Sequence, residues 1–312
     1  MLRIGLDIMG GDFAPREAVL GAVQAREELG ESLHIDLIGD RDAAMEIVKE
    51  AGANPIDFDY VHTTEVIGYN DHPTKAIMQK KNSSIALGFE LLKERKIDAL
   101  VGAGNTGAML VGAIYSVKPI EGIIRPTIAT IIPKLDGKIG LLLDVGANAD
   151  CRPDVLFQFG LLGSIFCQLV HKMENPRVGL LNIGEEKEKG NLATQAAYQL
   201  MEGNEQYNFT GNIEGRDIFD DKADVVVCDG FTGNVVLKAC ESFFYIMKKK
   251  GASNDFLDRF NYEDYGGTPI LGVNAPVIIG HGISNAKAFK NMIKLAKDMV
   301  DTKLCENIKA SF

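Results

Sequence analysis

The chain has 312 residues, of which 46% are hydrophobic, and its formal net charge at neutral pH is −10. This length and apolar content suit one large or two ordinary globular domains and exclude a disordered protein. The negative charge argues against a broad nucleic-acid-binding surface, so no nucleic acid is expected as a partner. Five scattered cysteines, without CxxC or Cys/His spacing, predict neither a disulfide framework nor a zinc site and fit a reducing cytoplasm.

Short apolar strands alternate with helical patterns along the chain. Strands are expected near 3–9, 34–39, 98–103, 138–145, 177–183, 224–228 and 276–280. Helices are expected at 15–29, 41–51, 73–95, 107–117, 153–173, 190–202, 234–250 and 285–308. This order predicts the α/β class with a largely parallel sheet. The strands IGLLLDV and DVVVCD lack alternation between polar and apolar residues, so helices should cover both faces of the sheet.

The division into domains carries only a weak signal. No repeat, low-complexity segment or Pro/Gly-rich linker marks a boundary. We expect a first α/β lobe at 1–150, a second at 151–283, and a terminal helix at 284–312 that returns to the first lobe. Neither a signal peptide nor a transmembrane helix is expected, because no long apolar segment occurs.

Four predicted strands deliver similar glycine-rich loops. The stretches are RIGLDIMGGD at 3–12, ALVGAGNTGAM at 99–109, LLLDVGANAD at 141–150 and VVVCDGFTGN at 225–234. In an open parallel sheet, ligands gather beyond the carboxyl ends of the strands, where loop N–H groups and helix amino termini converge. Such a place suits a phosphate or an oxyanion.

Polar side chains in these loops allow two interpretations. The aspartates Asp7, Asp12, Asp144 and Asp229 would repel an anion, and capping or turn formation is their more frequent role at such positions. The asparagines Asn105, Asn148 and Asn234 are uncharged and could donate directly to an oxyanion.

Positive charge precedes two helices. Lys189 and Gly190 lead into one helix, and Lys80 and Lys81 lead into the Asn82-Ser83-Ser84 start of another. Both places can hold an anion, and ordinary capping with solvated charge explains them equally well. His281 lies at a glycine-flanked strand exit, where a structural role is the more frequent one.

Motifs typical of nucleotide sites, metal sites and catalytic nucleophiles are missing from the sequence. GAGNTG alone is a weak signal, no GxxxxGK[ST] is present, and no acidic ribose-binding residue follows at the required spacing. There is no GxSxG or HExxH, and the histidines form no spaced set. We therefore expect no nucleotide, no metal, no cofactor and no activated protein nucleophile.

Seven segments together resemble the bacterial phosphate acyltransferases of phospholipid synthesis. They are DIMGGDFAP (7–15), KKNSS (80–84), GAGNTGAM (102–109), LLDVGAN (142–148), NIGEEKEKGN (182–191), DGFTGN (229–234) and YGGTPILGVN (265–274). The resemblance spans nearly the whole chain in the family's order. It implies transfer of a fatty acyl group from acyl carrier protein to inorganic phosphate, giving acyl phosphate. It also implies a homodimer and a three-layer α/β/α fold like isocitrate/isopropylmalate dehydrogenases, with a cleft between two lobes.

The resemblance assigns expected roles to residues of this chain. Expected catalytic residues are Lys189, Asn234 and Asp229. Expected phosphate- or substrate-binding residues are Ser83, Ser84, Lys81, Asn105, Thr106, Gly107, Asn148, Gly10, Gly11 and His281. The chain departs from the family's usual residues at Lys187, His72, Phe13 and Ile279, which weakens any role for those positions.

The segment near 241–262 is expected to form an amphipathic tip beside Lys248–Lys250. The resemblance implies that Phe243, Phe244, Phe256 and Leu257 touch a membrane surface. The alternative is that these side chains pack in the core or in the dimer. The expected location is the cytoplasm. The alternative is a peripheral position at the inner face of the cell membrane.

Phosphate brings its own nucleophilic oxygen to an activated thioester, so the protein mainly aligns the two and stabilises the oxyanion. The closest alternative is phosphotransacetylase-like transfer between acyl-CoA and phosphate. A metal-dependent hydroxyacid dehydrogenase and a nonenzymatic acyl-chain or phosphate-binding regulator are more distant alternatives.

Overall fold

A computed structural model of the chain describes residues 2–312. The chain divides into two compact units, of which the first comprises residues 1–120 and 262–305 and the second residues 121–261 and 306–312. The boundary falls near 120 and not near 150, because the strand at 127–133 pairs with the strand at 139–143 inside the second unit.

The first unit is built on a sheet in the order β3-β2-β1-β4-β11-β10. Its strands are β1 (Leu2–Asp7), β2 (Leu33–Gly39), β3 (Asp59–His62), β4 (Ala99–Gly102), β10 (Thr268–Leu271) and β11 (Val277–Ile279). All neighbours pair in parallel except β10 and β11, which are antiparallel. The carboxyl ends of β1, β4 and β11 therefore meet at one edge of this sheet.

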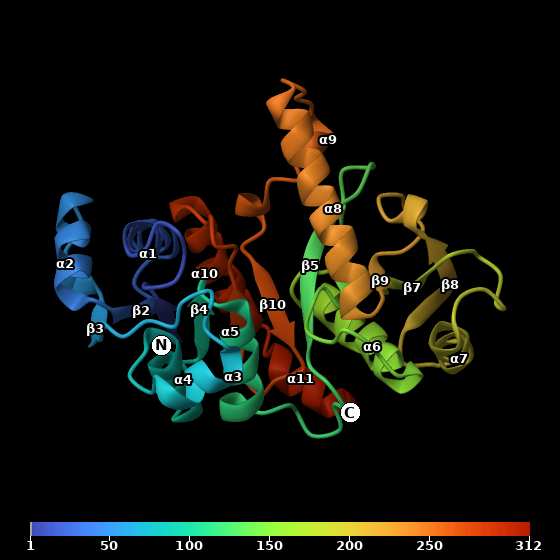
Figure 1. Cartoon of the computed structure of the whole chain (residues 1–312), viewed down its shortest axis with the longest axis horizontal. Coiled ribbons are helices and arrows are strands. Elements are labelled where there is room, and N and C mark those ends of the chain that lie inside the picture. The colour runs from blue at the N-terminus through green and yellow to red at the C-terminus, as the bar shows by residue number, and fades with distance from the viewer. Residues whose placement is uncertain (1) are drawn as a thin grey trace. The chain divides into compact units, whose positions relative to one another are not determined.

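Helices cover both faces of the first unit's sheet (Figure 1). They are α1 (Arg16–Leu29), α2 (Arg41–Glu50), α3 (Pro73–Gln79), α4 (Ser84–Lys93), α5 (Thr106–Gly112) and α10 (Ala286–Asp301). The connections from β1 to β2 and from β2 to β3 move in one direction along the sheet, and the connection from β3 to β4 moves in the opposite direction. Because such crossovers are right-handed, α1 and α2 lie on one face of the sheet and α4 lies on the other. Helix α10 packs beside α1, and its buried Ala288, Met292 and Met299 lie on its apolar face.

The second unit has a sheet in the order β5-β6-β9-β7-β8. Its elements are β5 (Thr127–Pro133), β6 (Ile139–Leu143), β7 (Arg177–Asn182), β8 (Asn208–Glu214), β9 (Val225–Val227), α6 (Pro153–Leu169), α7 (Leu192–Met201), α8 (Gly230–Lys249) and α9 (Asp255–Asp258). Only β5 and β6 pair antiparallel. Gly163 allows the apolar helix α6 to lie close to the sheet, because a Cβ at this position would come within 2.5 Å of the Val225 side chain.

The predicted α/β class with a mostly parallel sheet is confirmed. The pairs β5–β6 and β10–β11 are antiparallel exceptions within the mostly parallel sheet, and the strands β3, β5, β8 and β10 had no predicted counterpart. The expected terminal helix is two helices, α10 and α11 (Leu304–Ser311), separated where Lys303 adopts a φ of 51°. Within residues 2–312, no helix combines the length and the apolar character that spanning a membrane requires.

Candidate active site

Three loops of the first unit meet beyond the carboxyl ends of β1, β4 and β11. The Asp12 N–H donates to the Gly282 carbonyl at 2.7 Å, and the Gly280 N–H donates to the Gly102 carbonyl at 2.8 Å. A Cβ added to Gly10 would lie 2.5 Å from the Gly104 nitrogen, so a larger residue at position 10 would separate the loops. This group of loops, residues 8–12, 103–107 and 280–284, is called the first loop cluster below.

Ser83 and Ser84 begin helix α4 and are both buried. The Ser83 hydroxyl accepts a hydrogen bond from the Ala86 N–H at 3.3 Å and donates to the Lys80 carbonyl at 2.7 Å. Ser83 therefore acts as a helix cap, which is the plainer of its two predicted roles. Lys81 is exposed beside it.

Asn105 is the amino-terminal cap of α5 and is also committed to the fold. Its Oδ1 accepts from the Ala108 N–H at 2.9 Å, and its Nδ2 donates to the carbonyls of Gly68, Tyr69 and Asp71 at 3.0 to 3.3 Å. Thr106, the first residue of α5, is exposed and is the more accessible hydroxyl of this loop.

Gly107 packs closely, since a Cβ there would lie 2.5 Å from Pro73. Gly11, at a φ of +103°, adopts the left-handed conformation that glycine favours. His281 is exposed at the rim of the first loop cluster. Tyr69, which no motif pointed to, also joins this cluster, because its hydroxyl donates to the Ala103 carbonyl at 3.3 Å.

The second unit gathers polar groups after β6. Asp144 is fully buried, and its Oδ1 accepts from the N–H groups of Ile128, Gly146 and Ala147 at 3.0 to 3.2 Å. Its Oδ2 accepts from the Asn148 N–H at 2.7 Å and from the Asn148 Nδ2 at 2.9 Å. Burial raises the pKa of Asp144, and these donors oppose that shift.

The start of α8 lies against this turn. The Gly230 N–H donates to the Asn148 carbonyl at 2.7 Å, and a Cβ on Gly233 would lie only 1.9 Å from the Asp144 carbonyl oxygen. Asp229 caps α8, because its carboxylate accepts from the Thr232 N–H at 2.7 Å. Asn234 donates from Nδ2 to the Val145 carbonyl at 3.0 Å, which leaves its second amide hydrogen for another acceptor.

Lys189 lies in the loop after β7 and is exposed. Asn182 Nδ2 holds this loop by donating to the Lys189 carbonyl at 3.1 Å. Within residues 2–312, the Lys189 ammonium forms no ion pair, whereas neighbouring Lys187 pairs with Glu202 and lies over the Tyr198 ring. The predicted residues thus form one group in the first unit and another in the second.

The predicted tip is divided between packed and exposed side chains. Phe244, Phe256 and Phe260 pack together with Phe219, with ring centroids 5.2 to 6.3 Å apart. Phe243 on the neighbouring face of α8 is 60% exposed, while Leu257 is half-buried. Of the four residues expected at a membrane, Phe243 is the one that presents most of its surface to solvent.

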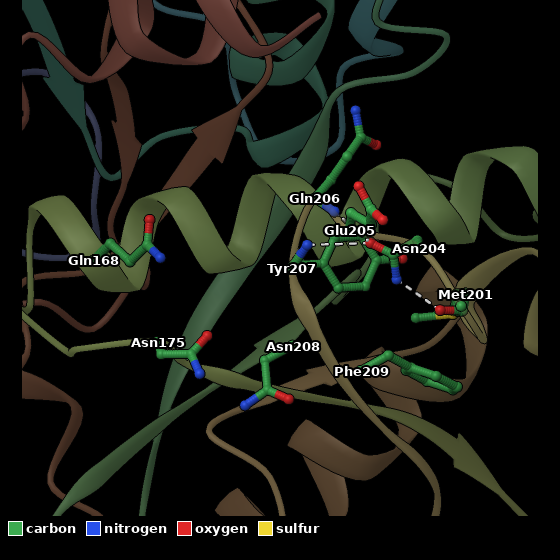
Figure 2. A pocket seen from close by; sticks show the side chains of 10 residues that line it. Gln168, Asn175, Met201, Asn204, Glu205, Gln206, Tyr207, Asn208 and Phe209 are labelled. Atoms are coloured by element: carbon green, nitrogen blue, oxygen red, sulfur yellow. Dashed lines mark hydrogen bonds between the residues drawn. The ribbon is translucent and has the colours of Figure 1, made fainter.

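Two surface cavities lie at the opposite, amino-terminal edge of the second unit's sheet. One, of about 410 Å³, is lined by carboxamides and by Tyr207 and Phe209 near the start of β8 (Figure 2). The other, of about 700 Å³, adjoins it at Asn175 and Asn208. No predicted site residue lines either cavity, so both are separate from the strand-exit loops.

Three acidic side chains, Glu185, Glu214 and Asp217, also approach one another. Lys222 pairs with Glu185 and Asp217 at 2.6 and 2.9 Å, and Arg216 pairs with Glu214. Cationic side chains of the chain itself therefore neutralise this cluster.

Comparison with known proteins identifies the family. A family model described as "Fatty acid synthesis protein" matches residues 2–307. The chain is 44% identical to the phosphate acyltransferase of Pelotomaculum thermopropionicum, over 99% of this chain and 95% of that one. It is 42% identical to the phosphate acyltransferase of Oceanobacillus iheyensis, over 99% and 97% of the two chains.

Solved structures share the fold at low identity. A phosphotransacetylase from Streptococcus pyogenes superposes with a TM-score of 0.67 at 15% identity, covering 96% of this chain and 94% of that one. A branched-chain phosphotransacylase from Enterococcus faecalis gives a TM-score of 0.64 at 16% identity, over 96% and 99% of the chains. Sequence similarity over the full length, together with this fold, shows that the chain belongs to the phosphate acyltransferase family of fatty acid and phospholipid synthesis.

Proposed function

We propose that the protein transfers a fatty acyl group from acyl carrier protein to inorganic phosphate, giving acyl phosphate in the cytoplasm. The observation that carries the proposal is the family match over residues 2–307, which includes every strand-exit loop described above. The protein acts on the acyl carrier protein thioester and on phosphate, and it uses no cofactor in this scheme.

The reaction needs no nucleophile from the protein. A phosphate oxygen attacks the thioester carbonyl carbon, the new C–O bond forms, and the C–S bond then breaks. The carrier's sulfur leaves as a thiolate and takes up a proton. The protein contributes alignment of the two substrates and hydrogen bonds to the oxyanion of the tetrahedral intermediate.

Phosphate is assigned to the first loop cluster. The Gly10–Gly11 turn can present N–H groups to an anion, while exposed Thr106 and Lys81 supply a hydroxyl and a positive charge. Three buried residues near these loops have a structural role: Ser83, Ser84 and Asn105. Ser83 and Asn105 already form hydrogen bonds to the backbone, so they hold the loops in place and do not contact phosphate directly.

The thioester is assigned to groups of the second unit. Lys189 stabilises negative charge with an ammonium that has no ion-pair partner among residues 2–312. Asn234 donates its second amide hydrogen to the thioester oxygen. Asp229 and Asn148 fix the start of α8 and the preceding turn, on which Asn234 depends.

The deciding experiment is incubation with palmitoyl-acyl carrier protein and labelled phosphate, followed by detection of acyl phosphate. Parallel reactions contain the matching coenzyme A thioester and several chain lengths. We expect acyl phosphate from the carrier-bound substrate at the higher rate. A preference for coenzyme A would instead favour phosphotransacetylase-like transfer, and ligand binding without product would reduce the protein to a binding module.

We also propose that a second copy of the chain covers helix α8. This helix buries only Gly230 and Gly233, and an apolar stripe runs along it. The stripe consists of Phe231, Val235, Ala239, Phe243 and Ile246, whose four large side chains are 50% to 67% exposed. Residues spaced in this way share one face of a helix, and such a face is typical of an interface.

A second copy suits the stripe better than a membrane does. The cluster Lys248–Lys250, which could attract anionic lipid, adjoins only one end of α8, whereas the stripe extends to Phe231 at the other end. Pairing with the same stripe of a partner would cover its part from Phe231 to Ala239. Membrane contact would then be confined to the tip, through Phe243 and the lysines beside it.

A further inference from the structure

Two aspartates occupy equivalent places, one at the end of β1 and one just after β6, and both side chains are fully buried. Their hydrogen bonds differ. Asp144 accepts from three N–H groups at Oδ1 and from two at Oδ2. Asp7 accepts at Oδ1 from the Met9 N–H at 2.9 Å, and its Oδ2 has no partner with hydrogen-bond geometry within residues 2–312.

The surroundings of Asp7 Oδ2 are backbone rather than solvent. Cβ atoms built on Gly10, Gly102 and Gly104 would lie 2.8, 3.3 and 3.3 Å from this oxygen. The loops after β1 and β4 therefore close over this oxygen, and no cationic side chain among residues 2–312 pairs with it. A buried, ionised carboxylate oxygen without a hydrogen-bond partner is strongly unfavourable, whereas a neutral carboxylic acid in the same place costs much less.

Groups that could favour the charged form of Asp7 are few. Burial raises the pKa of Asp7, and the opposing contributions come from the Ser84 hydroxyl and the N–H groups of Met9 and Gly10. None of these is a cation. The neighbouring titratable group is Tyr69, whose pKa is raised by burial and by interaction with Asp12 and Asp7.

We propose that Asp7 is a neutral carboxylic acid in the folded protein, and that its Oδ2–H donates to Ser84 and so joins the loop after β1 to the start of α4. Asp144, by contrast, has five N–H donors, all of which favour its charged form. Asp7 is then a positioning residue for the first loop cluster. Its effect on phosphate rests on the proposed function, but its protonation state does not.

Native isoelectric focusing tests the charge directly. Asp7→Asn should leave the isoelectric point of the folded protein unchanged, because a neutral group replaces a neutral group. Asp57→Asn, a change at an exposed carboxylate, is the matched control and should raise the isoelectric point by the step expected for one charge. An equal rise in Asp7→Asn would overturn the proposal.

Stability and kinetics provide a second test. Asp7→Asn should fold and keep the wild-type KM for phosphate, since its amide retains a donor, whereas Asp7→Ala should raise that KM. A raised pKa in the folded state means that the stability from Asp7 is complete below the unfolded carboxyl's pKa and is lost as pH rises through the folded value. Urea midpoints of Asp7→Asn relative to wild type should therefore improve from pH 4 to pH 8.

The outcomes separate the two proposals. If wild-type protein forms no acyl phosphate, the proposed function fails, while the focusing and urea experiments still decide the state of Asp7. If Asp7→Asn is as damaging as Asp7→Ala and shows no relative gain with pH, the neutral acid is rejected whatever the enzyme's activity.

Discussion

Asn148 donates both its backbone N–H and its side-chain amide to the same oxygen of Asp144, at 2.7 and 2.9 Å. The same Nδ2 also donates to the Pro126 carbonyl at 2.8 Å. This pair closes the turn on which α8 begins, because the Asn148 carbonyl accepts the Gly230 N–H. The asparagine therefore supports Asp144 first, and any contact with substrate is secondary.

The change Asn148→Asp should destabilise the protein, because it sets a second carboxylate against a buried one. We expect a loss of about 3 kcal/mol or more in the free energy of unfolding. Asn148→Ala removes the same amide bonds without adding charge and should cost about 1 to 2 kcal/mol. Urea unfolding measures both variants, and similar midpoints for the two would contradict this account.

Replacement of Lys189 tests the proposed catalysis. Lys189→Ala should lower turnover by about 10²-fold or more if the ammonium stabilises transition-state charge. Lys187→Ala is the matched control in the same loop, because Lys187 is already paired with Glu202. Acyl phosphate formation is the measurement, and near-normal turnover of Lys189→Ala would remove that residue from the mechanism.

Changes in the stripe of α8 test the proposed partner. Val235→Asp lies far from the basic tip and should convert a dimer to a monomer in analytical ultracentrifugation. Lys238→Ala, on the same helix but outside the stripe, is the control.

Flotation with acidic liposomes tests whether the tip of α8 binds a membrane. If Phe243→Ser abolishes flotation while the protein remains dimeric, the tip binds lipid and the rest of α8 binds the second copy. If the wild-type protein stays monomeric at high concentration, the proposed dimer is rejected.

His171 should make stability depend on acidity. Burial lowers the pKa of His171 to about 4, and its ring lies edge-on to Phe166 at 5.1 Å. The unfolded chain binds the proton more readily, so stability falls as pH drops from the unfolded value of about 6.5 toward 4, by at most about 3 kcal/mol. His171→Leu should remove this part of the dependence, which urea midpoints at pH 7.5 and pH 4.5 would measure.

Most strands buried on both faces were predictable from sequence, whereas the edge strands β3 and β8 and the strands β5 and β10 were not. The runs before Asp144 and Asp229 are continuous and apolar, as their burial requires. Strand β3 is a four-residue edge strand without a buried residue, and β10 contains Pro269, so neither carries the usual signal.

The sequence also predicted where the strand-exit loops lie, but it did not show which partners their side chains bind. Glycines at strand exits predicted close backbone approach, and the contact of Gly10 with Gly104 agrees with that. Whether Asn105 donates to substrate or to the fold depends on carbonyls 34 to 37 residues away in the chain. Only tertiary structure brings those partners together, so the motif could not reveal that the amide was already engaged.

The hydrogen bond from Asp12 to Gly282 has a consequence for biosynthesis. The first unit is assembled from two stretches separated by residues 121–261 of the second unit, and β11 supplies the neighbour of β4. During translation the amino-terminal strands must wait, with one flank of their sheet open, until residues 277–284 leave the ribosome. The order of synthesis thus leaves the first loop cluster incomplete until nearly the last tenth of the chain has been made.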